Sequence, residues 1–122
     1  MAMVLRALRG ATTLDEDTGA QVNDRVRALI SSMLEQNGIA HDDLVSVLFT
    51  ATDDISSMFP ATAARSLGLG DVPLICAREL NVIGAVPRCI RVLVHFYTEH
   101  SRESLHHIYL EGARGLRDDL PE

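Results

Sequence analysis

The most regular pattern along the chain is an alternation of apolar and mixed positions between residues 90 and 97. Bulky apolar side chains occupy every second position, and the intervening positions carry a mixed set: Arg91, Leu93, His95 and Tyr97. Because successive side chains of a strand point to opposite faces, this period of two predicts a strand with one buried face. Arg91 is then expected among bulky side chains on the mixed face, as in a pocket or a subunit interface.

A second pattern has the period of a helix. Apolar residues recur three or four positions apart between residues 22 and 34. Thr18, followed three residues later by Gln21, has the form of a capping box and favours a helix start. Asn37-Gly38 favours the end of the helix. The sequence therefore predicts an amphipathic helix between these signals.

Shorter apolar runs bounded by turn residues predict four more strands, over residues 4–9, 45–50, 72–76 and 107–110. Phe59-Pro60, followed by an alanine-rich stretch up to Gly68, predicts a short second helix with proline in its first turn and glycine at its end. About five strands and two helices indicate an α/β or α+β fold with a small mixed sheet.

The length and composition fit one globular domain. The chain has 122 residues, of which 47% are hydrophobic and 23% charged. This suffices for one hydrophobic core and is too short for two domains of ordinary size, so we expect a single domain over residues 1–122. Two helices cannot cover both faces of the predicted sheet, and we therefore also expect an oligomer.

The charge and the terminal sequence exclude several classes of function. A net charge of -6 argues against general binding to nucleic acid or to anionic membranes. No uncharged apolar stretch approaches the roughly 20 residues that span a bilayer, and the start lacks the apolar run of a signal peptide, which indicates a cytoplasmic protein. Neither the cysteines, Cys76 and Cys89, nor the histidines have metal-ligand spacing, so we expect no metal site and no disulfide.

Charged residues that interrupt apolar runs identify a candidate site. All eleven basic residues are arginine, so the residue type says little and its position must decide. Arg9, Glu79 and Arg91 each stand at or within strand-like sequence, where a desolvated charge is costly. Their recurrence at separate places predicts a built polar site that binds a small anion.

Five short motifs, in order along nearly the whole chain, resemble the monofunctional chorismate mutases of the AroH class. They are Arg9-Gly10-Ala11-Thr12-Thr13, Phe59-Pro60-Ala61 followed by Arg65, Cys76-x-x-Glu79, Cys89-Ile90-Arg91-Val92 and Tyr109-Leu110-Glu111. The resemblance implies a trimer of α/β subunits packed into a pseudo-barrel, with active sites in the clefts between neighbours. It also implies the rearrangement of chorismate to prephenate, on the path to phenylalanine and tyrosine, without a cofactor.

The implied reaction explains why the sequence offers neither a nucleophile with its base nor a metal cluster. A concerted rearrangement can be accelerated by holding the reactive conformer and by stabilising charge that appears in the transition state. Arginine suits both tasks. Its fork binds a carboxylate bidentately and can donate to an ether oxygen that becomes more negative as its bond to carbon breaks.

The resemblance also implies roles for individual residues. Arg91 would contact the ether oxygen and a substrate carboxylate, and Arg9 would hold the substrate. Glu79 would accept a hydrogen bond from the ring hydroxyl with Cys76 beside it, although a helix-start carboxylate and a buried thiol are alternatives. A general base at Glu79 is a third reading, which the chemistry does not require. Tyr109 would hydrogen-bond the enolpyruvyl end, or would be a core or interface residue with a satisfied hydroxyl.

Further substrate contacts are implied from the adjacent subunit. Phe59 would form an apolar wall, Arg65 would place a cation near a carboxylate, and Ala61 of the same motif would touch the substrate. Where relatives often carry lysine after this motif, the chain has Thr62, so one cation is missing. Arg65 is the residue that could compensate.

The C-terminal segment, residues 112–122, would carry Leu116 and Arg117 over the ligand as a mobile lid, although ordinary fraying fits it equally. Two other classes of function remain open. A trimeric imine deaminase of the RidA type has a similar architecture and an interface arginine, but the combination of Cys76-x-x-Glu79 with Arg91 speaks against it. A non-catalytic trimeric ligand-binding protein would bind chorismate or prephenate and leave chorismate unchanged.

Overall fold

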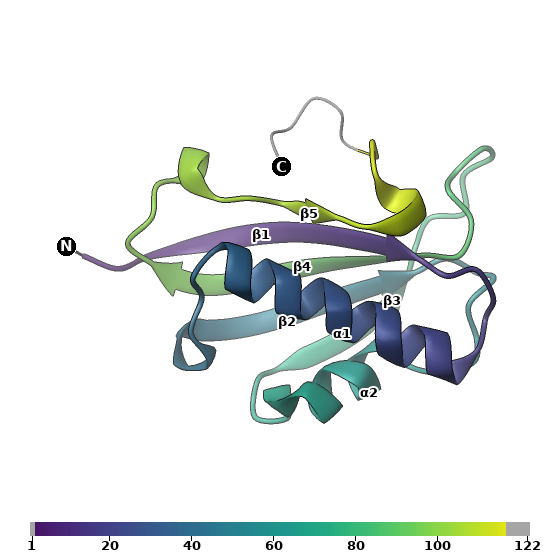
Figure 1. The fold of residues 1–122 in the computed structure, drawn as a ribbon, viewed down its shortest axis with the longest axis horizontal. Coiled ribbons are helices and arrows are strands. Elements are labelled where there is room, and N and C mark those ends of the chain that lie inside the picture. The colour runs from purple at the N-terminus through teal and green to yellow at the C-terminus, as the bar shows by residue number, and fades with distance from the viewer. Residues whose placement is uncertain (1, 117–122) are drawn as a thin grey trace.

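The fold is a single mixed sheet with helices on one face. The computed structural model describes residues 2–116. Five strands have the spatial order β3-β2-β4-β1-β5, and both helices lie on the same side of them (Figure 1). The elements are β1 (Val4–Thr13), α1 (Gly19–Gln36), β2 (Leu44–Ala51), α2 (Pro60–Ala64), β3 (Leu74–Arg78), β4 (Cys89–Thr98) and β5 (Ile108–Tyr109). The expected mixed sheet with two helices is confirmed.

The strand directions follow from the connections. β4 pairs antiparallel with both β1 and β2, whereas β3 runs parallel to β2 and β5 runs parallel to β1. Each predicted strand is present with shifted ends, and the third begins two residues later than predicted. The second helix is shorter than predicted because α2 gives way to a π-helical turn, Arg65–Leu69, within which Gly68 has a φ of 98°.

Helix α1 starts at the predicted cap. The Gln21 backbone N–H donates to the Thr18 hydroxyl oxygen at 3.2 Å. The Gln21 side-chain oxygen reaches further back than the capping box requires and accepts the backbone N–H groups of Asp15 and Glu16 at 2.8 and 3.1 Å. Together these bonds satisfy donors at the helix start and fix the turn that leaves β1.

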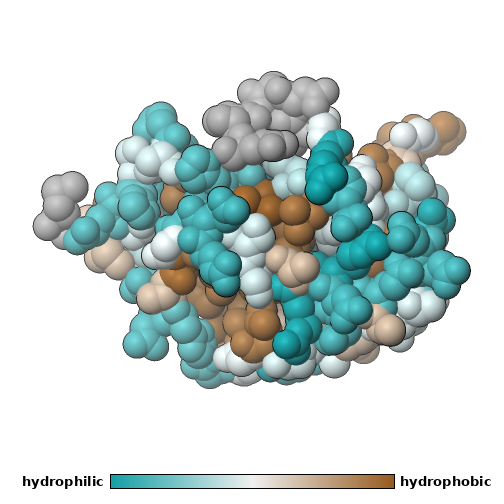
Figure 2. All heavy atoms as spheres, in the orientation of Figure 1, coloured by the Kyte–Doolittle hydropathy of each residue, from teal (hydrophilic) through white to brown (hydrophobic). Residues whose placement is uncertain are grey.

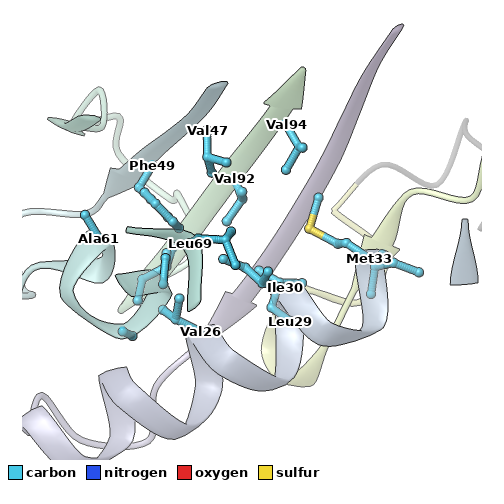
Figure 3. Packing of buried hydrophobic residues seen from close by; sticks show 14 of the residues in the cluster. Val26, Leu29, Ile30, Met33, Val47, Phe49, Ala61, Leu69, Val92 and Val94 are labelled. Atoms are coloured by element: carbon cyan, nitrogen blue, oxygen red, sulfur yellow. The ribbon is translucent and has the colours of Figure 1, made fainter. Parts of the chain in front are cut away.

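The core lies between α1 and the covered face of the sheet (Figure 3). The inward stripe of α1 packs on inward residues of β2 and β4, all of them at most 2% exposed: Val26, Leu29, Ile30, Met33, Val47, Phe49, Val92 and Val94. Burial of each such side chain contributes about 1.5–3 kcal/mol, so this layer fixes the position of the sheet.

Strand β1 continues four residues beyond its predicted end. Gly10 faces α1 so closely that a Cβ there would stand 2.5 Å from the Met33 sulfur. The strand nevertheless goes on because β4 pairs with it as far as Thr13, opposite Cys89. Arg9 therefore lies within a strand, not at its end as the sequence suggested.

Among residues 2–116, neither α1 nor α2 lies over the opposite face of the sheet (Figure 1). The alternation predicted for β4 is confirmed, since Ile90, Val92, Val94 and Phe96 are buried while the mixed set lies on the other face. That face also carries exposed apolar side chains, with Leu5, Ile75 and Tyr97 exposed by 51%, 62% and 47%. It is thus both the less covered face and the one that holds Arg91.

The helix-covered face is largely hydrophilic at its surface, and an apolar loop tip projects from its edge (Figure 2). This tip belongs to the connection between β3 and β4, where Val82 and Ile83 are exposed. Within residues 2–116, neither helix has the length and apolar character needed to cross a membrane.

Candidate active site

A pocket on the uncovered face brings together the three charged residues singled out in the sequence. Arg9 comes from β1, Glu79 directly follows β3, and Arg91 comes from β4. The pocket has a volume of ≈ 210 Å³. Its apolar walls include Leu48, Leu93, Tyr109 and Leu116.

Glu79 is held by contacts on both carboxylate oxygens. Its Oε2 lies 3.3 Å from Arg91 Nε and accepts a hydrogen bond from the Thr50 hydroxyl at 2.8 Å. Its Oε1 accepts the Leu80 backbone N–H at 3.1 Å, and its own N–H donates to the Ala51 carbonyl at 3.0 Å. The carboxylate is therefore fixed beside Arg91 by the sheet itself.

Arg91 retains free capacity for a ligand. Its side chain is 44% exposed, against 25% for Glu79, and the ion pair uses only the Nε end of the guanidinium. Burial raises the pKa of the neighbouring Cys89 thiol, although the charge and hydrogen bond of Arg91 act in the opposite direction. Cys89 is thus a protonated thiol at neutral pH and not an activated nucleophile.

The Arg9 backbone is anchored while its side chain is left available. The Arg9 N–H donates to His107 Nδ1 at 2.9 Å. Among residues 2–116, the Arg9 guanidinium has no ion-pair partner. Two guanidinium groups and one carboxylate thus leave the pocket with a net positive charge.

The Tyr109 hydroxyl is buried and lacks a hydrogen-bond partner in the described part of the chain. Its side chain lines the same pocket, with its backbone paired to Ala11 of β1. Among residues 2–116, the structure therefore shows no partner of the kind that a core tyrosine with a satisfied hydroxyl would have. A buried polar group without a partner costs about 1–3 kcal/mol, which a ligand could offset by hydrogen bonding to it.

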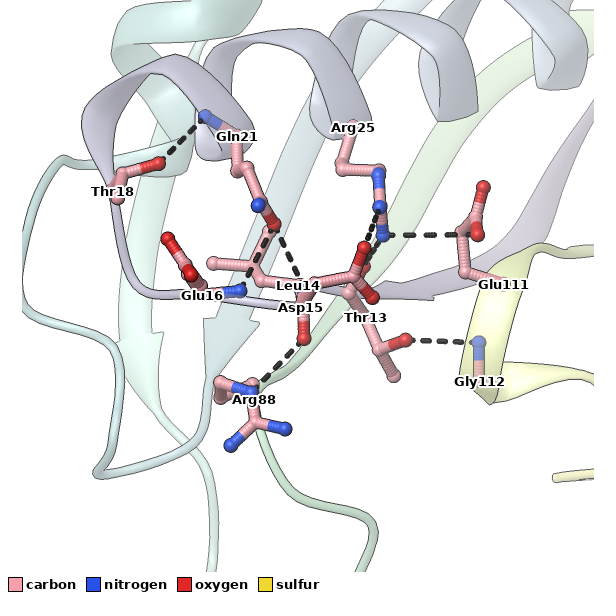
Figure 4. Close-up of polar contacts among 10 residues, drawn as sticks. All are labelled: Thr13, Leu14, Asp15, Glu16, Thr18, Gln21, Arg25, Arg88, Glu111 and Gly112. Carbon is pink, nitrogen blue, oxygen red and sulfur yellow. Dashed lines mark hydrogen bonds and ion pairs between the residues drawn. The ribbon is translucent and has the colours of Figure 1, made fainter.

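The start of the C-terminal segment is tied to the end of β1 (Figure 4). The Gly112 N–H donates to the Thr13 hydroxyl at 2.9 Å. Arg25 of α1 donates to the Thr13 carbonyl and also lies 3.8 Å from the carboxylate of Glu111. These contacts fix where the chain turns toward the pocket.

Beyond this turn the chain returns over the uncovered face. Ala113 is fully buried and clusters with Ala11 and Cys89, and Leu116 packs against the same group. Leu116 thereby lines the pocket of Arg9, Glu79 and Arg91. Arg117, assigned to the same segment, lies outside the described residues.

A second pocket, of ≈ 460 Å³, contains two of the other implied residues, Phe59 and Cys76. Cys76 pairs with the core residue Phe49 in the β2–β3 register. Within one chain, Cys76 therefore does not share the pocket of Glu79, contrary to the expectation that the two lie side by side. The odd spacing of residues 76 and 79 is the reason, since neighbouring positions of a strand face opposite sides.

The loop before Phe59 is held by Asp17, whose carboxylate accepts the backbone N–H groups of Ser56 and Ser57 at 2.9 and 3.1 Å. The side-chain hydrogen bond from Ser57, followed by the other bonds from these serines, lowers the pKa of Asp17. The Phe59 side chain itself is 71% exposed.

Ala61 and Arg65 line neither of these two pockets. Ala61 is buried in α2, whereas Arg65 is exposed and donates from its guanidinium to the Thr62 hydroxyl at 3.4 Å. Thr62, which stands where relatives often carry lysine, thus contacts Arg65, the residue that was expected to compensate for the missing cation.

Sequence reasoning missed two residues that line the charged pocket, Thr50 and Leu48. Thr50 and Leu48 alternate along β2, and Thr50 pairs with Arg91. The alternation could have been recognised, but which strands lie side by side could not. Within residues 2–116, no group of histidine, cysteine, aspartate and glutamate side chains could hold a metal ion.

Comparisons with known proteins agree on one family. Residues 5–120 match the family model described as chorismate mutase type I. The chain is 45% identical over 118 residues to the chorismate mutase AroH of Thermus thermophilus, covering 96% of this chain and 97% of that protein. It is 37% identical over 119 residues to the chorismate mutase AroH of Bacillus subtilis, covering 97% and 94%. A chorismate mutase structure from Clostridium thermocellum superimposes with a TM-score of 0.88 at 38% identity, covering 89% of this chain and 97% of that one.

Proposed function

The chain belongs to the type I chorismate mutases, and on this premise we propose that the pocket of Arg9, Glu79 and Arg91 holds chorismate during its rearrangement to prephenate. The reaction is an isomerisation. A carbon–oxygen bond of the ether breaks and a carbon–carbon bond forms within the same molecule. The observation that carries the proposal is the contact between Arg91 and Glu79 in a pocket that also contains Arg9.

The net charge of the pocket suits a dicarboxylate. Chorismate carries two carboxylates, and the pocket offers the guanidinium groups of Arg9 and Arg91 against the single carboxylate of Glu79. Bidentate pairing of arginine with carboxylate fixes both distance and orientation. Arg9, whose guanidinium has no ion-pair partner among residues 2–116, is the residue we assign to holding the substrate.

Arg91 is the main electrostatic catalyst in this proposal. Its Nε faces Glu79, so its terminal nitrogens remain to meet a substrate carboxylate and the ether oxygen. Negative charge on that oxygen grows as its bond to carbon breaks. A donor already in place therefore stabilises the transition state more than the ground state, which is the condition for acceleration.

Glu79 orients the substrate by accepting a hydrogen bond from its ring hydroxyl. The Thr50 hydroxyl and the Leu80 N–H donate to the Glu79 carboxylate and Arg91 lies against it, so these contacts fix where Glu79 presents its oxygens as acceptors. The rearrangement moves no proton, so a general base is not needed. Of the described residues that line this pocket, none is a serine, cysteine or histidine, as suits a reaction without a covalent intermediate.

Tyr109 and Leu116 close the end of the pocket that receives the enolpyruvyl group. The Tyr109 hydroxyl, which has no hydrogen-bond partner among residues 2–116, is available to donate to the substrate. Leu116 follows the turn held by Thr13 and Gly112. In this proposal residues 112–122 close over the bound ligand, with Arg117 among them.

We further propose that three chains form a pseudo-barrel and that each active site lies between neighbours. The exposed apolar residues of the uncovered face, including Leu5, Ile75 and Tyr97, support burial against other copies. The pocket with Phe59 and Cys76, together with Ala61 and Arg65, then supplies the second half of the site of the next subunit. In this arrangement Cys76 meets the substrate from the neighbour and not beside the Glu79 of its own chain. A cytoplasmic location, in aromatic amino acid biosynthesis, completes the proposal.

The test is the loss of chorismate absorbance with wild type, Arg91→Ala and Arg102→Ala. Arg102 is an exposed arginine away from the pocket and serves as the matched control. We expect fast loss with wild type and with Arg102→Ala, and near-complete loss of activity in Arg91→Ala. Equal rates in all three proteins would contradict the role of Arg91.

Two other outcomes would replace the proposal. Turnover of an imine without turnover of chorismate would favour an imine deaminase. A thermal shift on adding chorismate or prephenate, with no turnover, would favour a non-catalytic binding protein.

A further inference from the structure

The β1–β5 ladder is short and is extended at one end by a side chain. Gly10 pairs with Ile108 and Ala11 pairs with Tyr109, and the Leu110 N–H donates to the Ala11 carbonyl at 2.9 Å. Because peptide groups alternate in direction along a strand, the N–H of Arg9 points to the same side as that of Ala11. In a continued parallel ladder, the backbone carbonyl of residue 106 would accept it.

That carbonyl is engaged elsewhere. The buried Asn37 side chain, at the C-terminal end of α1, donates to the His106 carbonyl at 2.9 Å and accepts the His106 N–H at 2.6 Å. The backbone at His106 is thereby docked on α1. The Arg9 N–H donates instead to the imidazole Nδ1 of His107, at 2.9 Å.

We infer that His107 is a positioning residue for Arg9: its Nδ1 takes the place of a missing ladder carbonyl and fixes the register of the strand that presents the Arg9 guanidinium to the pocket. The inference rests on the proposed role of Arg9 in holding the substrate. The geometry requires the imidazole tautomer that carries its proton on Nε2, because an Nδ1 that accepts a hydrogen bond carries no proton.

This position matters because Arg9 works at the end of a long side chain. A part-buried N–H without an acceptor would pull the backbone toward water or another acceptor, and the guanidinium would move with it. Displacements of about 1 Å are enough to weaken a substrate contact substantially. His107 also precedes Tyr109 by two residues, so both side chains lie on the same side of their segment by alternation. One short segment thus supplies Tyr109 and holds Arg9.

The experiment compares variants that keep or remove an acceptor at the Nδ1 position. In His107→Asn, the side-chain Oδ1 can stand where Nδ1 stands, whereas in His107→Gln the carbonyl reaches the Nε2 position. His107→Leu removes both acceptors. KM and kcat for chorismate are measured for these variants, for Arg9→Ala and for the double variant Arg9→Ala/His107→Leu, with thermal unfolding of each protein alongside.

We expect His107→Leu and His107→Gln to raise KM by roughly three- to tenfold with a smaller change in kcat, the size of a lost hydrogen bond to a positioned group. His107→Asn should stay within about twofold of wild type, since its acceptor remains in place. In the Arg9→Ala background, His107→Leu should change KM no further, because the group it positions is absent.

Distinct results separate the inference from the proposed function. A raised KM in Arg9→Ala with unchanged KM in His107→Leu and His107→Gln overturns the inference alone. An equal rise of KM in His107→Asn, His107→Gln and His107→Leu also overturns the inference, because it indicates that His107 acts through packing. An unchanged KM in Arg9→Ala overturns both statements. If His107→Leu does not fold, the contrast between His107→Asn and His107→Gln decides.

Discussion

The hydroxyl of Thr50 donates to the same Glu79 oxygen that faces Arg91, with distances of 2.8 Å to the hydroxyl and 3.3 Å to Nε. The three residues meet because Thr50 and Arg91 are direct partners across the β2–β4 ladder, while Glu79 follows β3 on the other side of β2. Thr50 therefore holds the carboxylate at a fixed point between two strands, where it can orient both Arg91 and a substrate hydroxyl.

Replacing Thr50 with valine keeps the shape of the side chain and removes this donor. We expect kcat/KM for chorismate to fall by roughly three- to tenfold, the cost of one hydrogen bond to a charged group. Thr50→Ser retains the hydroxyl and should stay close to wild type. A valine variant as active as the serine variant would show that Glu79 does not need this contact.

The close packing of Gly112 against Thr13 allows a steric test of the C-terminal segment. A Cβ at this position would stand 2.7 Å from the Thr13 hydroxyl oxygen, which is too close without displacement. Gly112→Ala should therefore push the segment with Leu116 away from the pocket and lower kcat/KM by roughly tenfold or more, as misplacement of a closing segment does.

Gly70→Ala is the matched control for this change. Gly70 has an ordinary φ of -65° and open space around its missing Cβ. Steady-state kinetics on both variants should separate them clearly. Equal activity of the two would contradict a role for the docked segment.

Thr62 offers a test by gain of charge. Thr62→Lys adds a cation next to Arg65, the residue that now donates to the Thr62 hydroxyl. If α2 faces the site of a neighbouring subunit, KM should fall by roughly two- to fivefold at low ionic strength, and the gain should shrink with added salt. Thr62→Val, which loses the hydroxyl without adding charge, is the control. A KM for the lysine variant equal to that of Thr62→Val at low salt would argue against this placement.

Asp54 predicts a pH dependence of stability. Burial raises its pKa, but the hydrogen bonds from the Thr52 hydroxyl and the Arg88 N–H outweigh burial, and the pKa is lowered below its ordinary value of 3.8. A lowered folded-state pKa stabilises the protein above pH 3.8, and this stabilisation is lost as the pH falls through the folded-state value.

Asp54→Asn should therefore lower the free energy of unfolding at pH 7 by no more than about 1 kcal/mol, because the carboxylate is exposed and screened by water. The difference from wild type should narrow below pH 3.8. Denaturant unfolding at several pH values measures it. A constant difference across this range would contradict the assignment.

The sequence predicted which helices and strands form better than it predicted where each of them begins and ends. The alternation in β4 and the cap of α1 were readable because each is set by local periodicity and hydrogen bonding. The full length of β1 could not be predicted, because a glycine such as Gly10 is typical of a turn. This position requires glycine because the Met33 side chain, from a helix later in the chain, leaves no room for a Cβ.

The charged residues of the candidate site could be predicted from the sequence, but their meeting in one pocket could not. Arg9, Glu79 and Arg91 stand out as charges in apolar surroundings, and the family resemblance assigned them roles. The strand order that brings them together depends on long-range pairing, as does the docking of His106 on Asn37 that leaves His107 to hold Arg9. Cys76 shows the opposite case, because strand alternation alone would place it on the other face of the sheet from Glu79.

The central claim is that Arg91 stabilises the transition state more than it binds the substrate. The most direct measurement is the pair of constants kcat and KM for Arg91→Gln, which keeps a donor but removes the charge and the fork, set against Arg9→Gln. We predict that kcat falls by roughly 100- to 1000-fold in Arg91→Gln, with a much smaller rise in KM, while Arg9→Gln mainly raises KM. An Arg91→Gln enzyme with wild-type kcat and only a raised KM would contradict the claim, because Arg91 would then bind substrate and transition state equally.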